Sequence, residues 1–346
     1  MRPGVRQDIK PVARQSEASP KVAIIILNWN GGRDTLACLE SVRRLVYPNF
    51  QVVVVDNGST DGSVDEIRGW MSREASAKMS LSEPAARLRP QEARFVLVEN
   101  KMNLGFSEGV NVGIRHVLAA PSPPDFVFLL NNDARVEASA VSHCVEVSLK
   151  EGAAIVGAVI RSSDGTAVLF AGARFPRELF VGGRVALETT LRDLDAWESA
   201  RAEASAMLIR RDVIERRLRE CGHVLNPALF MYLEEIDLCR WTHERGLPTM
   251  IAGEAIAYHQ LGRSGGALRH YYLTRNRILL ARRLLPFPQR VVFFAWFFPF
   301  RMGQAMLRLL GGKSAAARAT MAGLRDGYRS ITGKWVRHPL NGGTRR

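Results

Sequence analysis

The chain has 346 residues, of which 47% are hydrophobic, and a formal net charge of +14. This length suits one large domain or two smaller ones with a sizeable core. Its four cysteines include no Cys-x-x-Cys pair, which argues against a zinc site and a disulfide framework and is typical of a reducing compartment. Residues 1–20 are polar and lack the apolar stretch of a signal peptide, so we expect a disordered leader and a cytoplasmic protein.

The amino-terminal half alternates between apolar runs and helical patterns. Strands are predicted over residues 22–27, 51–55, 95–98 and 125–130. Helices are predicted over residues 33–46, 63–70 and 108–119. Repeated β-α-β units imply an α/β fold with a mostly parallel sheet, helices on both faces, and the loops after the strands along one edge.

The second half is less regular. Strands are predicted over residues 154–160, 168–170 and 204–209. Helices are predicted over residues 211–219, 234–244 and 270–285. From residue 261 onward, 17 Arg and Lys accompany one acid, Asp326, so this segment carries +16 and residues 1–260 carry −2. Such a segment is typical of proteins that bind nucleic acid or an anionic membrane.

Polar side chains follow two of the buried strands. Asn131-Asn132-Asp133 ends one strand, where α/β proteins place ligands, and its oxygens suit a hard divalent cation. Asp56, which ends another, can accept hydrogen bonds from a ribose or a base, and Gly58 lets backbone approach a ligand. The alternative for this second loop is a plain turn with Thr60 or Asp61 capping the next helix.

Three further features have both a functional and a structural interpretation. Glycines 105, 109 and 113 at a helix start either bring backbone N–H groups to a diphosphate or allow close helix packing. His259 is either a metal ligand or a structural hydrogen bonder. The acids of Glu234-Glu235-Ile236-Asp237 supply either a general base and metal ligands or a solvated first helical turn.

In this order, these residues resemble glycosyltransferase family 2 with the GT-A fold, in its rhamnosyltransferase-like branch. The resemblance spans roughly residues 22–260, through matching stretches at 25–30, 54–61, 103–113, 128–133, 230–240 and His259. It implies a catalytic domain over residues 21–262, with a donor half over 21–150 and an acceptor half over 151–262. Residues 263–346 would form a basic helical extension.

The resemblance also implies residue roles. Asp133 matches the metal-binding acid of the family's Asp-x-Asp motif, with Asn131 in place of the first acid, and His259 would complete a Mn²⁺ or Mg²⁺ site. Glu235 stands at the position of the catalytic base, with Glu234 as the alternative. Met231 and Tyr232 would line the acceptor side. The donor site would comprise Asn28, Asp56, Asn103, Gly105, Phe106, Asn111, Asn131, Asn132 and Asp133.

The implied reaction is inverting transfer of a sugar from a nucleoside-diphosphate donor to a hydroxyl of a glycan or polyprenyl-diphosphate-linked glycan. The carboxylate takes the hydroxyl proton, and the cation offsets the charge of the leaving diphosphate. Arg263, Arg275 and Arg277 would add to that neutralisation. L-Rhamnose from dTDP is the first expectation, with galactofuranose, glucose, mannose and N-acetylhexosamine from UDP or GDP as alternatives.

Two other classes of protein fit less well. A sugar-phosphate nucleotidyltransferase expects a glycine-rich loop with basic residues after the first strand, but Asn28-Trp29-Asn30-Gly31-Gly32-Arg33 has one Arg and no Lys. A nucleic-acid binder expects aromatics interleaved with Arg, but residues 291–300 are an uncharged apolar block. We therefore expect no nucleic-acid partner.

The apolar block over residues 291–300 predicts a contact with lipid. Ten residues are too few to span a bilayer, which needs about 20. Set in a segment of charge +16, the block favours an interfacial helix on anionic lipid at the inner face of the cell membrane. The alternative is a core helix packed on the catalytic domain.

Overall fold

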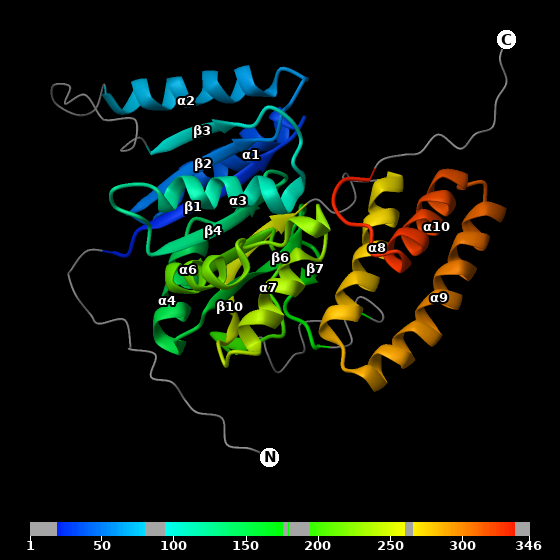
Figure 1. Ribbon diagram of the computed structural model, residues 1–346. Helices are drawn as coiled ribbons and strands as arrows, with labels where there is room; N and C mark the ends of the chain where they lie inside the picture. Colours follow the sequence, from blue (N-terminus) through cyan, green and yellow to red (C-terminus); the bar gives the residue numbers. More distant parts are fainter. Residues whose placement is uncertain (1–18, 80–93, 176–178, 180–193, 260–265, 336–346) are drawn as a thin grey trace, which may run out of the picture.

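A computed structural model describes residues 19–79, 94–175, 179, 194–259 and 266–335. The expected leader (except for its last two residues) and Arg263 lie outside these ranges. A mixed α/β sheet carries helices on its faces, and three carboxyl-terminal helices lie beside it (Figure 1). The strand order is β3-β2-β1-β4-β9-β6-β10-β5, with β7 beside β6 and β8 beside β10.

The amino-terminal half follows the predicted β/α alternation. Its elements are β1 Val22–Asn28, α1 Gly32–Arg43, β2 Phe50–Asp56, α2 Ser63–Met79, β3 Phe95–Glu99, α3 Gly105–Leu118 and β4 Phe126–Asn131. The four strands pair in parallel, and β1, β2 and β4 are almost fully buried runs of aliphatic and aromatic residues, as a sheet covered on both faces requires. In the strand register Asn28 lies opposite Asp56, and Leu27 opposite Asn131, so the polar strand ends meet at one edge.

The second half mixes strand directions. Its elements are β5 Ala134–Val136, α4 Ala140–Glu151, β6 Ile155–Ser162, β7 Val168–Phe170, β8 Ala196–Glu198, β9 Ala206–Arg210, α6 Arg211–Cys221, α7 Glu234–His243 and β10 Thr249–His259. Strand β9 runs antiparallel between β4 and β6, whereas β10 is parallel to β6. The sheet is therefore parallel from β1 to β4, as expected, and mixed beyond β4.

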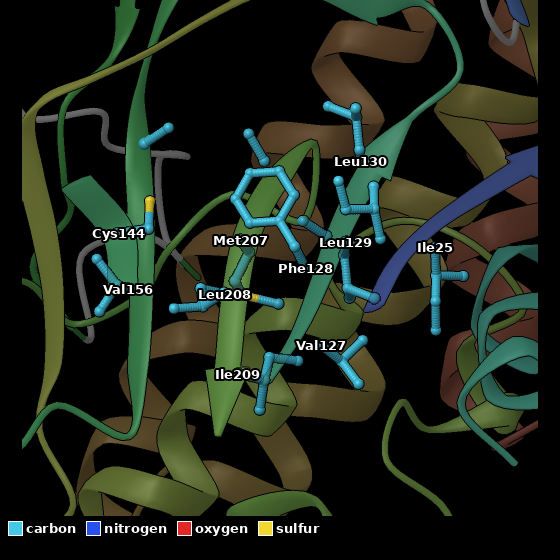
Figure 2. Packing of buried hydrophobic residues seen from close by; sticks show 14 of the residues in the cluster. Ile25, Val127, Phe128, Leu129, Leu130, Cys144, Val156, Met207, Leu208 and Ile209 are labelled. Atoms are coloured by element: carbon cyan, nitrogen blue, oxygen red, sulfur yellow. The ribbon is translucent and has the colours of Figure 1, made fainter. Parts of the chain in front are cut away.

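One hydrophobic core joins the two halves of the sheet. Figure 2 shows side chains of β4 and β9 packed together between Ile25 of β1 and Val156 of β6. On another face, α3 lies close to the sheet because a Cβ at Gly109 would come within 2.5 Å of Leu27, and one at Gly113 within 2.8 Å of Ile25. These two glycines thus serve helix packing, which is the structural interpretation of their spacing.

The carboxyl-terminal helices are α8 Gly266–Leu284, α9 Phe287–Leu310 and α10 Ser314–Tyr328. They form a second hydrophobic cluster, in which Phe293 and Phe297 of the predicted lipid-facing block are buried. That part of the block belongs to the core, as the alternative interpretation held. Among the described residues, no helix is both long and apolar enough to cross a membrane.

Candidate active site

The first polar cluster holds two strand ends together. The Asn28 amide nitrogen donates to Asp56 Oδ1 at 2.7 Å, and Asp56 Oδ2 accepts from the backbone N–H groups of Gly58 and Ser59 at 3.1 and 2.9 Å. Asn28 and Asp56 are 0% and 1% exposed. Both side chains therefore organise the loop that follows β2, and the predicted contact of Asp56 with a nucleoside stays a prediction.

Asn57, which the sequence analysis did not single out, joins this loop to the next one. Its amide nitrogen donates to Asn103 Oδ1 at 3.1 Å and to the Gly105 carbonyl at 3.0 Å. Gly105 has a φ of +84°, and a Cβ there would lie 2.5 Å from Phe230. Glycine is thus required for a tight turn against residue 230. Phe106 packs on the main core.

The side chain of Asn111 is used in hydrogen bonds that hold the fold together. Its side-chain oxygen accepts from the backbone N–H groups of Val224 and Leu225, at 3.3 and 3.0 Å, and its nitrogen donates to the Leu225 carbonyl at 2.8 Å. The residue is 1% exposed. It fastens the loop after α6 to α3, and we leave it out of the donor site proposed below.

Asp133, the last residue of the Asn131-Asn132-Asp133 stretch, lies next to His259 at the end of β10. Strand β5 pairs antiparallel with β10, with Ala134 opposite His259, and this register brings Asp133 Oδ1 within 3.0 Å of His259 Nε2. Asp133 and His259 are 126 positions apart in the sequence. The two side chains are 13% and 16% exposed, so they are accessible from one side.

The two asparagines that precede Asp133 differ in their hydrogen bonding. Asn132 donates through Nδ2 to Thr35 Oγ1 at 3.1 Å, which anchors it to α1. Asn131 Oδ1 is buried and has no hydrogen-bond partner among the described residues. Such an atom is costly unless something else binds it. Within the described part of the chain, no three His, Cys, Asp or Glu side chains gather as a metal site, so a cation held by Asp133 and His259 would need a further ligand of another kind.

Glu234 and Glu235 begin α7 in different electrostatic surroundings. They are 5% and 7% exposed. Glu235 Oε1 lies 3.4 Å from Arg201 Nη1, and Arg201 Nη2 lies 3.1 Å from Glu203 Oε1. Glu234 Oε2 is buried without a hydrogen-bond partner among the described residues, and burial, with the charge of Glu235 second, raises its pKa well above the usual value. Glu235 is therefore the better candidate for a charged base.

Asp237, the third acid of this helix, is structural. It is 1% exposed and pairs with Arg217 of α6 at 2.5 Å and with Arg283 of α8 at 2.7 Å. The sequence analysis included Asp237 among the acids that supply a base or metal ligands. The structure instead uses it to tie α7 to two other helices.

A strained loop leads into α7. Phe230, Tyr232 and Leu233 have positive φ angles of 64°, 69° and 70°, which non-glycine residues rarely adopt. Asn276 of α8 holds this backbone by donating through Nδ2 to the carbonyls of Leu229, Met231 and Tyr232, at 3.0, 2.8 and 2.9 Å. Strain of this kind persists only where the surroundings enforce it, and it is common at functional sites.

Tyr232, in the strained loop, is within electrostatic reach of both acidic clusters, one with Asp133 and the other with Glu234. Burial raises the pKa of its hydroxyl, and the nearby charges of Glu234 and Asp133 raise it further, opposed by Arg269. The predicted acceptor-side residue, the predicted metal ligand and the carboxylate pair therefore lie in one neighbourhood.

Two of the arginines predicted to neutralise phosphate have other contacts. Arg275 is 0% exposed and donates to the backbone carbonyls of Ala228, Leu229 and Gly333. The prediction for Arg275 was wrong, because a side chain enclosed in this way supports the strained loop. Arg277 donates to the Leu273 carbonyl within α8. Arg201 and Asn276, which matter most here, lie outside any recognisable motif, and no sequence signal pointed to them.

Residues 23–218 match the family described as Glycosyl transferase family 2. The chain belongs to this family. It is a glycosyltransferase, as the resemblance implied. No curated protein matches the sequence.

Solved structures share the fold at low sequence identity. The mannosyltransferase PcManGT from Pyrobaculum calidifontis, in complex with GDP-Man and Mn²⁺, has a TM-score of 0.57 and 14% identity, over 90% of this chain and 88% of that one. GalNAc-T7 with UDP, GalNAc and Mn²⁺ has a TM-score of 0.53 and 14% identity, over 71% and 44%. S. aureus TarS 1-349 in complex with UDP-GlcNAc has a TM-score of 0.53 and 13% identity, over 90% and 81%.

Proposed function

We propose that this glycosyltransferase moves a sugar, with inversion, from a nucleoside-diphosphate donor to an acceptor hydroxyl. One observation carries the proposal: the strained loop with Tyr232 leads into two adjacent buried glutamates, and Tyr232 is within electrostatic reach of Asp133, which pairs with His259 at the sheet edge. Inversion needs a single carboxylate base on the acceptor side and no covalent intermediate. The product's anomeric configuration, read from NMR couplings or NOE patterns, tests this part. A retained configuration would reject direct displacement.

Glu235 is the proposed base. Arg201 keeps a positive charge 3.4 Å from one of its oxygens, which favours the ionised form that accepts a proton. Burial, with the charge of Glu235 second, raises the pKa of Glu234, so Glu234 ionises less readily than an ordinary carboxyl and is the second candidate for the base. The strained loop at Met231 and Tyr232 would position the acceptor hydroxyl toward Glu235.

A divalent cation, Mn²⁺ or Mg²⁺, is the proposed cofactor. Asp133, His259 and the buried oxygen of Asn131 would hold it, since they offer one charge, one imidazole and one unpartnered amide oxygen. When bound, the cation would offset the charge that develops on the leaving diphosphate. The Mn²⁺ named with two of the similar structures supports this choice.

For the donor, we propose dTDP-L-rhamnose first. The nucleotide sugars named with the similar structures are GDP-Man and UDP-GlcNAc, and UDP is named with a third, so UDP and GDP donors stay in the test. The donor would lie along the loops held by Asn28, Asp56, Asn103 and Gly105, above Asn132. Phe106 would support these loops from the core.

The test is a thermal-shift screen of the full chain with dTDP, UDP and GDP, each with and without Mn²⁺. A ligand that binds only the folded state raises the melting temperature. We expect one nucleotide to give a shift that Mn²⁺ enlarges, and we expect Asp133→Ala to lose the Mn²⁺-dependent part. If none of the three nucleotides changes the melting temperature with Mn²⁺ present, the donor proposal fails.

The proposed acceptor is a glycan or a polyprenyl-diphosphate-linked glycan at the inner face of the cell membrane, in a pathway of cell-envelope polysaccharide synthesis. The proposed location is therefore cytoplasmic and peripheral. The charge of +16 beyond residue 260 supports an anionic surface as partner.

A further inference from the structure

Helix α9 presents a continuous apolar surface to solvent. Apart from Gln289 in its first turn, its large exposed side chains are apolar: Phe287, Val291, Val292, Phe300, Met302, Met306, Leu307, Leu309 and Leu310. Several are more than half exposed, with Leu307 at 70% and Leu310 at 75%. Ala295, Pro299 and Gly303 are exposed between them. Isolated exposed apolar residues are common on proteins, but a continuous patch along one helix marks an interaction surface.

The charged residues of the middle and end of α9 point the opposite way. Arg301 is 8% exposed and donates through Nε to Thr274 of α8 at 3.1 Å and through Nη1 to Gln304 at 2.8 Å. Arg308 donates to Thr320 of α10 at 3.2 Å. A helix on the surface of a water-soluble protein places its apolar stripe inward and its charges outward. Helix α9 buries some apolar side chains too, but it also exposes apolar side chains along most of its length and turns Arg301 inward.

The helix that follows α9 carries exposed cationic side chains. Lys313, Arg318, Arg325 and Arg329 are exposed on or beside α10, the helix that follows α9. The single acid after residue 260, Asp326, is 3% exposed and is bound by Tyr271 at 2.9 Å and Arg325 at 2.7 Å. An apolar helix face whose neighbouring helix carries exposed cations, with the one acid of this segment buried, is complementary to anionic lipid, and the same excess of charge opposes pairing with a second copy.

We propose that the outward face of α9, from Val291 to Leu310, is a docking surface for an anionic lipid bilayer. The helix lies in the plane of the interface, with its apolar side chains below the headgroups and the basic residues of α10 at headgroup level. This places the docking surface partly outside the block identified from sequence, since Phe293 and Phe297 are core and residues 302–310 are the more exposed end.

The docking surface connects directly to the strained loop. Arg301 of α9 binds Thr274, which precedes the two α8 residues that hold residues 228–232. A docked α9 would therefore hold the acceptor side of the site close to the bilayer. This link to a lipid-carried acceptor rests on the proposed function, whereas the docking surface itself stands independently of it.

The test compares two double variants of the full chain in vesicle flotation. Leu307→Gln/Leu310→Gln removes apolar contact at the exposed end of α9. Val46→Gln/Leu149→Gln is the matched control, because these residues are 67% and 49% exposed on the sheet half. Deleting the chain after Leu285 is a poorer test, since it removes Gly333, whose carbonyl binds Arg275 at 2.6 Å.

With phosphatidylglycerol–phosphatidylcholine vesicles at low salt, the wild type and the control should float. The α9 variant should partition at least about tenfold less, because each buried leucine contributes more than a tenfold step. Added salt should weaken the binding of the wild type to the vesicles, and so should vesicles of pure phosphatidylcholine. Melting curves with the nucleotide found in the screen show whether the variants still fold and bind donor, which separates failure of docking from failure of the proposed chemistry.

Three results would overturn the proposal. The first is a wild-type chain that stays at the bottom of the gradient at low salt. The second is an equal loss for the control, which would make the binding unspecific. The third is a wild-type dimer in sedimentation that Leu307→Gln/Leu310→Gln converts to monomer without change in flotation, which would make the face a subunit interface.

Discussion

The two glutamates at the start of α7 can be told apart by paired substitutions. We expect Glu235→Gln to lose most of kcat while donor binding is unchanged, because only the proton acceptor is removed. A positioned base contributes roughly 10²–10⁴-fold, which corresponds to about 3–5 kcal/mol of activation free energy. Glu234→Gln should lose less than roughly 10²-fold, because burial raises the pKa of Glu234 and disfavours the charged form that a base needs.

The structure indicates that both variants fold. In Glu235→Gln, Arg201 keeps Glu203 at 3.1 Å as its counter-ion. The assay is kcat with the nucleotide sugar identified by the thermal-shift screen, together with calorimetric binding of its nucleoside diphosphate. An inactive Glu234→Gln beside an active Glu235→Gln would refute the assignment and move the base by one residue.

Three further predictions concern metal, pH and folding. Asp133→Ala should abolish transfer and the response to Mn²⁺, whereas His259→Ala should weaken the Mn²⁺ response more than it lowers the melting temperature; full wild-type activity in EDTA would contradict both. The raised pKa of Glu234 means that the folded state binds a proton more tightly than the unfolded state, so stability falls as pH rises above the unfolded value of about 4.3. Glu234→Gln should therefore melt higher than wild type at neutral pH and lose this advantage toward pH 4, and equal melting temperatures at both pH values would disprove it. Asn111→Ala leaves the N–H groups of residues 224 and 225 without their acceptor and should cost about 2–5 kcal/mol of unfolding free energy in a urea titration, with nucleotide affinity unchanged in the variant that remains folded.

The donor half was predictable because its strands are short, fully buried and rich in aliphatic residues. Each of β1, β2 and β4 extends to the polar residue that follows the apolar run, namely Asn28, Asp56 and Asn131. Strand β10 was harder, because Gly253 and Glu254 interrupt its pattern and the register shifts between Ala252 and Ile256. Local periodicity recognises an element only while the pattern is regular.

The sequence proposes the candidate site as a set of residues, but it does not predict the contacts between them. The approach of Asp133 to His259 depends on the register of β5 with β10, which follows from the complete sheet. Glu234 differs from Glu235 through its burial, and Glu235 has its ion pair with Arg201, which lies in an irregular segment between β8 and β9. The family resemblance implied that Asn111 belongs to the donor site, and only tertiary contacts reveal its three buried hydrogen bonds to residues 224 and 225.

The support that α8 gives to the strained loop limits how this enzyme can be recombined with its relatives. A chimera joined between β10 and α8 would combine a loop from one parent with the side chains that shape it from another. Asn276 would then have to match the carbonyls of a foreign loop, and Arg275 would have to match both that loop and Gly333. Exchange of acceptor preference should therefore transfer residues 226–335 as one cassette, with the junction in the loop after α6.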